Sequence, residues 1–600
     1  MRISLLLIVL SLVLATAFLA NEGFPNGLFS LKELGFYFTV CLTSLMVLIT
    51  CLKYNYCPVF SFSPLELAVL SFLVLIPCYQ YFVLNVKFTN LAISIGAYII
   101  FYSISIVGRN YHWTRVGKSV FTVVLIAIIA QLTLSILQYI GWITAYHHAS
   151  RVSGMFFNPG PYSIYITSLV MVMFPILVLS AKNKKHISLL FLLTVFIIFI
   201  VINFELKSRS SWMGFAAGIF AITCIYLFKF KDSIRWRKNK TTRILIALLL
   251  ISIPFVGWWF YQIRPESASG RMLIWKSTIG MIQDNFWNGV GIGNFAGRFP
   301  IYQADELQNQ TTGSRYGMLA GETDYAFNDL LQIFADFGLF GGILFILIII
   351  CAFVRLVRFI KQKGYTNSRF MLGSGLMASL LVIIISGLTS YPNQMLPTYI
   401  WFWTLIGLII LITSESSTYN PSKPFSAMNL ALLSLGISLS FGYYYYKKTI
   451  AFHIWDKVKR GAINYGDNLQ DLKYLDNEGE LLNEIGHYFS RDGKSTLAKY
   501  YFETAKTCRF DKEDYYDLGF ILERQGKYIE ALGNYKLVEE SIPYLLKPKV
   551  LQAKLLYSLG RKDEFAIKAR EVIEMKPKVK SASNELLKKE MRFLLKKIDD

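Results

Sequence analysis

The sequence predicts an all-α membrane protein, in which a polytopic bundle of transmembrane helices is followed by a soluble helical region at the C-terminus. Hydrophobic residues make up 54% of the 600-residue chain and aromatic residues 16%. Apolar runs recur up to residue 445. Each run is about twenty residues long, which is enough to cross ~30 Å of hydrocarbon. Beyond that point acidic and basic residues alternate, as on the surface of a soluble domain.

The apolar runs predict about 12–13 membrane spans. Arg2 followed by Ile3–Ala20 resembles a signal peptide, but the run is longer than a usual signal h-region, so we interpret it as the first span. The spans are expected near residues 3–20, 35–52, 64–85, 90–108, 119–141, 160–180, 187–204, 211–228, 243–261, 330–354, 371–390, 397–413 and 427–445.

Basic loops between the spans set the orientation. Lys and Arg cluster in the loops after spans four, six, eight and ten, at residues 109–118, 182–185, 229–243 and 355–369. The positive-inside rule places all of these loops in the cytoplasm. The loops after odd-numbered spans then face outward, and the formal charge of +22 needs no nucleic acid to explain it. The outward segments are 142–159, Lys207–Ser210, 262–328 and everything after Tyr446.

The C-terminal region contains a repeat. Gly486 and Gly519 are equivalent glycines about 33 residues apart, and small and large residues recur in phase around both. This alternation is typical of tetratricopeptide repeats, and an unrelated helical bundle is the alternative. The predicted domains are a transmembrane domain at 1–445 with the outer loop 262–328, a linker at 446–479 and helical repeats at 480–600.

The cysteines give no sign of a metal centre or a disulfide framework. Six of the seven lie in or beside apolar runs, and only Cys508 lies in a long soluble region. The spacing of Cys and His does not match a metal site. We therefore expect no metal and no cofactor.

Arginines near the predicted outer surface are the main chemical signal. Arg209 lies within a run of serines at the outer end of span eight, Arg271 lies just past span nine, and Arg151 precedes span six. A guanidinium stays charged and offers a planar fork that fits phosphate oxygens, so these residues are candidates for holding a lipid diphosphate. A single arginine in such a place commonly snorkels to lipid headgroups, but the serine run around Arg209 favours a site.

A glycine-rich segment, Gly289-Val290-Gly291-Ile292-Gly293, is superficially similar to a dinucleotide-binding fingerprint. It lacks the strand before it and the helix after it that a βαβ unit requires, so we reject that interpretation. The glycines instead predict a tight turn close to a lipid or a sugar.

Several motifs together resemble the O-antigen ligase and polymerase superfamily of bacterial membrane glycosyltransferases. Their order, spacing and common side of the membrane make the set specific, and the resemblance covers about residues 90 to 415. Some members also carry tetratricopeptide tails. The motifs are Ser208-Arg209-Ser210, Gly270-Arg271 with Trp275, the glycine-rich segment with Asn294 and Phe295, and Phe327-Asn328-Asp329-Leu330-Leu331-Gln332 followed by Asp336, Gly338 and Gly341.

The resemblance implies a polyprenyl-sugar transferase-like fold in the bacterial inner membrane. It implies transfer of a glycan from undecaprenyl diphosphate to an acceptor, without a metal, with the repeats in the periplasm. Arg209 and Arg271 would bind the diphosphate and stabilise its charge as the glycosidic bond breaks. Arg151, Trp275 and Asn328 complete the expected substrate-binding set. The expected partners are the lipid-linked glycan, a lipid or glycan acceptor, membrane lipids and a protein bound by the repeats, but no nucleic acid.

One position departs from the family pattern. Members usually have a histidine before the asparagine of the closing motif, and that histidine serves the acceptor hydroxyl. Here the residue is Phe327, whose ring neither takes nor donates a proton. A positioned base adds only ~10²–10⁴-fold to a rate, so activity can survive its loss. Glu322 and Asp324 are the candidate replacement bases, and His147 and His148 in another outward loop are the alternative.

Other functions stay open at the level of sequence. The acceptor is lipid A core or a growing polysaccharide, and a protein O-oligosaccharyltransferase is the alternative within enzymes. A polysaccharide-related transporter would carry charges in the middle of its spans, whereas the arginines singled out here lie at the outer ends. A non-catalytic envelope scaffold that uses the repeats is consistent with Phe327.

The topology makes a direct prediction. Alkaline phosphatase fused after Arg460 should be active, because an odd number of spans precedes Tyr446. A reporter that works only in the cytoplasm should be silent at the same position. The reverse pair of results would contradict the topology and the outward position of the loop 262–328.

Overall fold

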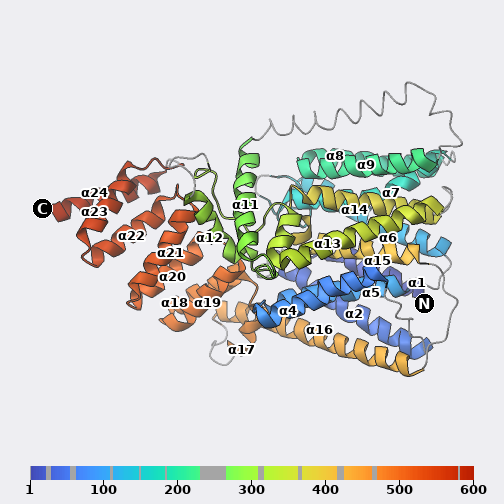
Figure 1. The fold of residues 1–600 in the computed structure, drawn as a ribbon, viewed down its shortest axis with the longest axis horizontal. Helices are drawn as coiled ribbons and strands as arrows, with labels where there is room; N and C mark the ends of the chain where they lie inside the picture. The colour runs from blue at the N-terminus through green and yellow to red at the C-terminus, as the bar shows by residue number, and fades with distance from the viewer. Residues whose placement is uncertain are drawn as a thin grey trace, which may run out of the picture.

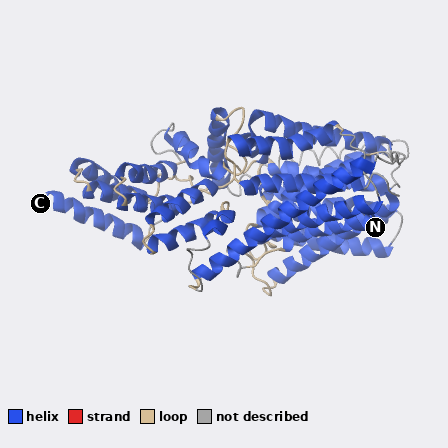
Figure 2. Cartoon of the chain, turned by 90° about the horizontal axis from the view of Figure 1, so that it is seen from below, coloured by secondary structure: helices blue, strands red, loops and turns tan. Residues whose placement is uncertain are grey.

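The computed structural model describes most of the chain as helices joined by loops (Figure 2). The described residues contain no strand, and they confirm the prediction of an all-α polytopic protein. The described residues are 2–21, 29–54, 63–107, 113–147, 150–182, 186–229, 265–308, 316–362, 368–414, 424–461, 469–578 and 581–599.

Eighteen helical segments of the described chain, from α1 to α16, make up the membrane region, with α11 and α12 at its end (Figure 1). Their bounds are α1 (Arg2–Ala15), η1 (Thr16–Phe18), α2 (Ser30–Tyr54), α3 (Pro64–Leu70), η2 (Ser71–Leu75), α4 (Ile76–Val83), α5 (Phe88–Val107), α6 (Trp113–Tyr139), α7 (Pro159–Lys182), α8 (His186–Glu205), α9 (Arg209–Lys229), α11 (Pro265–Asp284), α12 (Phe295–Gln308), α13 (Asp329–Gln362), α14 (Ser368–Gly387), η4 (Pro392–Gln394), α15 (Leu396–Thr413) and α16 (Pro424–Lys459).

Nine segments among the described helices are long and apolar enough to cross a membrane. A tenth apolar helix, Leu6–Phe18, is shorter. α9 and α16 overlap the spans predicted near 211–228 and 427–445, and the span predicted near 243–261 lies outside the described residues. The protein is therefore a multi-pass membrane protein, and the total of about 12–13 spans stays a prediction.

The loops that were predicted to face outward gather at one end of the bundle. α9 and α13 begin at this end, α16 finishes there, and the C-terminal helices extend away from it (Figure 1, left). The N-terminus lies at the opposite end of the bundle (Figure 1, right). The candidate site and the C-terminal region therefore share one side of the membrane region.

A buried ion cluster fixes the C-terminal region to the bundle. The ammonium of Lys448 in α16 lies 2.8 Å from the carboxylate of Glu33 in α2 and 3.2 Å from that of Glu478, and its side chain is fully buried. Asn477 accepts a further hydrogen bond from it at 2.9 Å. A buried charge is tolerated only when it is paired and hydrogen-bonded, as here. This cluster holds the start of the tail against α2 and α16.

The C-terminal helices follow one another as antiparallel pairs. A side chain at Gly486 in α18 would meet the Phe502 ring of α19 at 2.6 Å, and one at Gly519 in α20 would meet the Tyr535 ring of α21 at 2.3 Å. The predicted alternation of small and large residues thus corresponds to equivalent contacts in two successive pairs, although the tetratricopeptide assignment and the domain bounds stay predictions. The helices are α17 (Leu469–Leu472), η5 (Lys473–Leu475), α18 (Gly479–Arg491), α19 (Ser495–Cys508), α20 (Lys512–Arg524), α21 (Tyr528–Ser541), α22 (Leu546–Ser558), α23 (Lys562–Glu574) and α24 (Ala582–Asp599).

The long helix α13 is broken at Gly338, which has φ 67° and ψ −168°. The break frees backbone groups, and the glycine-rich segment supplies their partners. The amide of Val290 donates to the carbonyl of Ala335 at 2.8 Å, and the amide of Gly291 donates to that of Asp336 at 3.0 Å. Buried backbone groups must be paired in this way, so the glycine-rich segment completes the helix that follows it.

All three glycines of the segment, Gly289, Gly291 and Gly293, have positive φ, as the predicted tight turn requires. Side chains at these positions would collide with Asp336, Val86 and Asn90 respectively. The turn is therefore packed against protein on the side where side chains would project, and the approach of a lipid or sugar to it stays a prediction.

The break at Gly338 makes a prediction about stability. A side chain there would lie 2.3 Å from the carbonyl oxygen of Trp287, and the backbone conformation is open to glycine alone. Gly338→Ala should lower the free energy of unfolding by about 2 kcal/mol or more, measured as thermal unfolding in detergent. Gly436→Ala is the matched control, because open space surrounds Gly436 in α16. Equal melting temperatures for the two variants would contradict this role of the break.

Candidate functional site

Arg209 and Arg271 approach each other although 61 residues separate them in the sequence. Arg209 is the first residue of α9, and Arg271 lies in the second turn of α11. Burial lowers the pKa of Arg271, and the nearby charge of Arg209 lowers it further. Two neighbouring cations repel each other, and an anion between them relieves that repulsion. The N-terminus of α9 adds a partial positive charge at the same place.

The serines around Arg209 position the arginine. Ser208 caps α9 by accepting a hydrogen bond from the amide of Ser211 at 3.3 Å. The Ser211 hydroxyl is 2.8 Å from that of Thr167 in α7, and Ser210 accepts from the Thr389 hydroxyl at 3.1 Å. The start of α9 is thereby tied to α7 and to the end of α14. The serine run thus fixes the backbone from which Arg209 projects.

Phe327, at the position where the resemblance implies a histidine, lies beside Arg271. Its ring centroid lies 5.6 Å from the guanidinium carbon of Arg271. Its φ of 50° is unusual for a bulky residue, so the surrounding structure holds the backbone in this conformation. Arg271 gains a cation–π contact, and no proton-transfer group is present at this position.

Tyr391 is a site residue that the sequence reasoning missed. It lies in the short loop between α14 and α15, and it is only 4% exposed. Its ring stacks on Tyr325 at a centroid distance of 4.5 Å and meets the Phe327 ring edge-on at 4.9 Å. Its hydroxyl accepts a hydrogen bond from the side-chain amide of Asn158 at 3.0 Å. The one available signal was a polar run, residues 390–394, at the outer end of a predicted span.

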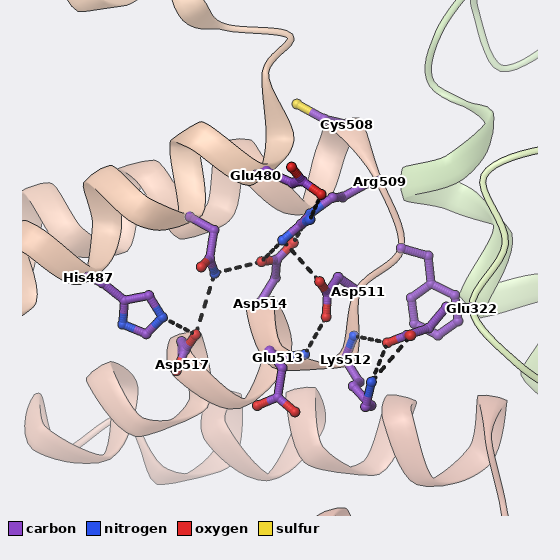
Figure 3. A network of polar contacts seen from close by, with 12 residues as sticks. Glu322, Glu480, His487, Cys508, Arg509, Asp511, Lys512, Glu513, Asp514 and Asp517 are labelled. Atoms are coloured by element: carbon purple, nitrogen blue, oxygen red, sulfur yellow. Dashed lines mark hydrogen bonds and ion pairs between the residues drawn. The ribbon is translucent and has the colours of Figure 1, made fainter. Parts of the chain in front are cut away.

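The two candidate bases both contact the C-terminal helices. Asp324 accepts a hydrogen bond from the amide of Phe510 at 3.2 Å. Glu322 accepts from the amide of Lys512 at 2.7 Å and from its ammonium at 3.1 Å (Figure 3). Farther along the same interface, Gln303 of α12 donates to the carbonyl of Ser541 at 2.8 Å. The outer loop is therefore held against the start of α20 and the end of α21.

Asp324 differs from Glu322 in its electrostatic surroundings. Although Asp324 as a whole residue is exposed, its carboxylate is turned into the interface with the C-terminal helices. This burial raises its pKa to about 6, against the opposing effects of the Phe510 amide and of Arg509. The charge of Asp324 also acts on Tyr391, which in turn interacts with Arg271. Of the two acids, Asp324 is thus the one linked to the arginine pair.

The other three predicted substrate-binding residues, Asn328, Trp275 and Arg151, lie on three separate elements of the fold. Asn328 caps α13, because its side-chain oxygen accepts from the amides of Leu330 at 3.0 Å and Leu331 at 3.1 Å. Trp275 lies one turn beyond Arg271 on α11, and its indole N–H is buried without an acceptor among the described residues. Arg151 is exposed in the loop before α7, and no contact within the described part of the chain joins it to the arginine pair.

Asp329 and the histidines lie around this centre. Asp329 begins α13, where the sequence suggests an ordinary role at a helix N-terminus. Asp329 lies in the first turn of α13 as predicted, and its carboxylate also accepts from the amide of Asn393 at 3.3 Å and from the Asn393 side chain at 2.9 Å. His147 lies in the loop before α7, and His148 falls outside the described residues.

The fold and the site define a multi-pass membrane protein that presents two adjacent arginines at one end of its helical bundle. Residues 194–346 match the family model described as O-antigen ligase. The match runs from α8 into α13 and includes Arg209, Arg271 and Phe327.

This match confirms the resemblance to the O-antigen ligase superfamily for residues 194–346, about a quarter of the chain. The family match supports a role in glycan transfer during polysaccharide or lipopolysaccharide assembly, and it indicates a glycosyltransferase-type enzyme. A search of curated proteins found no match.

The geometry predicts different outcomes for the two acids. Asp324→Asn keeps an oxygen that accepts from the Phe510 amide but removes a base, and it should lower glycan transfer by ~10²-fold or more. Glu322→Gln should stay near wild type. In the wild-type enzyme the rate should rise as pH rises through about 6, because Asp324 acts when it is deprotonated. Transfer is measured as surface glycan in complemented deletion strains and as rate against pH in membranes.

A rescue variant tests the same assignment. Adding Phe327→His to Asp324→Asn should restore part of the lost rate, because imidazole then supplies a base beside Arg271. Wild-type activity in Asp324→Asn would exclude it as the base. It would leave base-free transfer or His147 and His148 as explanations.

Proposed function

We propose that the protein transfers a glycan from an undecaprenyl diphosphate carrier to an acceptor, lipid A core or a growing polysaccharide, at the outer face of the bacterial inner membrane. The observation that carries the proposal is the adjacent pair Arg209 and Arg271. Two cations held together at the end of a helical bundle favour a ligand with at least two negative charges. A lipid diphosphate has that charge and a chain that remains in the membrane.

The proposed chemistry is stabilisation of the leaving group. The acceptor hydroxyl attacks the anomeric carbon of the donor sugar, and the bond from that carbon to the diphosphate oxygen breaks. Negative charge grows on the departing diphosphate, where the guanidinium groups of Arg209 and Arg271 donate hydrogen bonds to its oxygens. The proton of the acceptor hydroxyl passes to Asp324. A diphosphate is a good leaving group, so most of the acceleration comes from the arginines.

The outward orientation is supported by the distribution of basic residues. α13 begins at the site with Asp329 and carries Arg355, Arg358 and Lys361 near its other end. The predicted cytoplasmic loops and the site therefore lie at opposite ends of this helix. With the positive end in the cytoplasm, the arginine pair and the C-terminal helices face the periplasm.

The contacts of the C-terminal helices support a role on the acceptor side of the reaction. These helices contact the outer loop through Glu322 and through Asp324, which is the proposed base. We propose that they bind the acceptor or a protein that delivers it. A protein O-oligosaccharyltransferase would use the same donor site, so the arginine pair serves either acceptor.

Arginine substitutions test the proposal. Arg209→Ala and Arg271→Ala should each abolish transfer while membrane insertion stays normal. Arg209→Lys and Arg271→Lys should restore little, because an ammonium lacks the bidentate fork. The measurements are lipid-linked donor and mature surface glycan in a deletion strain carrying each variant.

The expected pattern is accumulated donor with missing product. Arg151→Ala is the matched control, because Arg151 is an exposed arginine at the same end of the bundle. It should retain most of the activity. Normal product from both alanine variants at positions 209 and 271 would refute the proposed site, and unchanged glycans in the deletion strain would favour a transporter or a scaffold.

A further inference from the structure

The candidate site contains a buried hydroxyl whose hydrogen has no acceptor among the described residues. The oxygen of Tyr391 already accepts a hydrogen bond from Asn158 at 3.0 Å, so its own O–H points elsewhere. Within the described ranges, no acceptor for that hydrogen is present. Tyr391 is 4% exposed, which leaves little solvent to take the place of a partner. Buried donors without partners are rare in native proteins and call for an explanation.

The position of Tyr391 indicates what the missing partner is. The centroid of the Phe327 ring lies 5.6 Å from the guanidinium carbon of Arg271 and 4.9 Å from the centroid of the Tyr391 ring. Tyr391 and Arg271 therefore contact the same phenyl ring. An anion that accepts hydrogen bonds would pair with the hydroxyl donor and would also relieve the repulsion between the two nearby cations.

The protonation state of Tyr391 suits a donor. Burial raises its pKa above the ordinary value, although the nearby charge of Arg271 opposes this effect. The phenol therefore keeps its proton at neutral pH. The hydrogen bond from Asn158 into its oxygen polarises the O–H group and strengthens it as a donor.

We propose that the Tyr391 hydroxyl is a third diphosphate-binding group, which donates a hydrogen bond to the lipid diphosphate beside Arg209 and Arg271. This inference rests on the proposed function and adds a positioning residue to it. The hydroxyl is neutral, so its hydrogen bond orients the bound diphosphate, whereas the arginines attract the diphosphate by their charge. Asn158 acts through Tyr391 by fixing the orientation of its O–H group.

The test is direct binding of undecaprenyl diphosphate to the purified full-length protein in detergent. Tyr391→Phe removes only the hydroxyl and keeps the ring contacts, and it should weaken binding on the order of tenfold, as expected for a hydrogen bond to a charged group. Tyr325→Phe is the matched control, since it removes a hydroxyl from the ring stacked on Tyr391. Its affinity should stay within about twofold of wild type, because the hydrogen bond to the diphosphate is still made.

A second variant separates a ligand role from a packing role. The Asn158 side-chain oxygen also accepts from the Gly160 amide at 2.8 Å and so caps the start of α7. Asn158→Ser keeps a capping oxygen but loses the amide that donates to the phenol, so binding should weaken several-fold while the melting temperature of the unliganded protein changes little. Wild-type affinity in Tyr391→Phe would overturn the inference, and so would equal losses in Tyr391→Phe and Tyr325→Phe. Arg271→Ala in the same assay reports on the proposed function separately. If Arg271→Ala loses binding and Tyr391→Phe does not, only the role of Tyr391 fails.

Discussion

The mutual repulsion of Arg209 and Arg271 is the constraint on which the candidate site depends. The pair is held together by elements that are distant in the sequence. Arg209 begins α9, which is capped by Ser208 and hydrogen-bonded to Thr167 of α7 and to Thr389 just after α14. Arg271 lies over the Phe327 ring. Holding two cations together costs free energy, and an anionic ligand regains it on binding. The matched O-antigen ligase domain contains both arginines, so the charge pair and the family assignment point to the same place.

The C-terminal helices are part of this construction. Lys448, Glu33 and Glu478 form a buried cluster that fixes the tail to the bundle. Asp324 and Glu322 then hold the outer loop against the start of α20. The loop is thus braced by the bundle from one side and by the tail from the other. A displacement of the tail would therefore displace Asp324 as well.

The sequence predicted the helical bundle, the outer loop and the arginine pair, because apolar length and positive charge are local signals. It did not find Tyr391, whose contacts with Phe327 and Asn158 join distant segments. It placed Asp329 at the start of a helix, as the fold does, but it did not predict the pairing of its carboxylate with Asn393. It predicted the tight glycine turn, but the completion of the break in α13 by that turn is visible only in the packed structure.

The central claim is that Arg209 and Arg271 together hold a lipid diphosphate. Its most direct test is a cryo-electron microscopy structure of the protein with undecaprenyl diphosphate in a lipid nanodisc. The account predicts density for the two phosphates within hydrogen-bonding distance of both guanidinium groups, next to the Phe327 ring. Diphosphate density elsewhere on the protein, with the two arginines making no contact to it, would contradict the account.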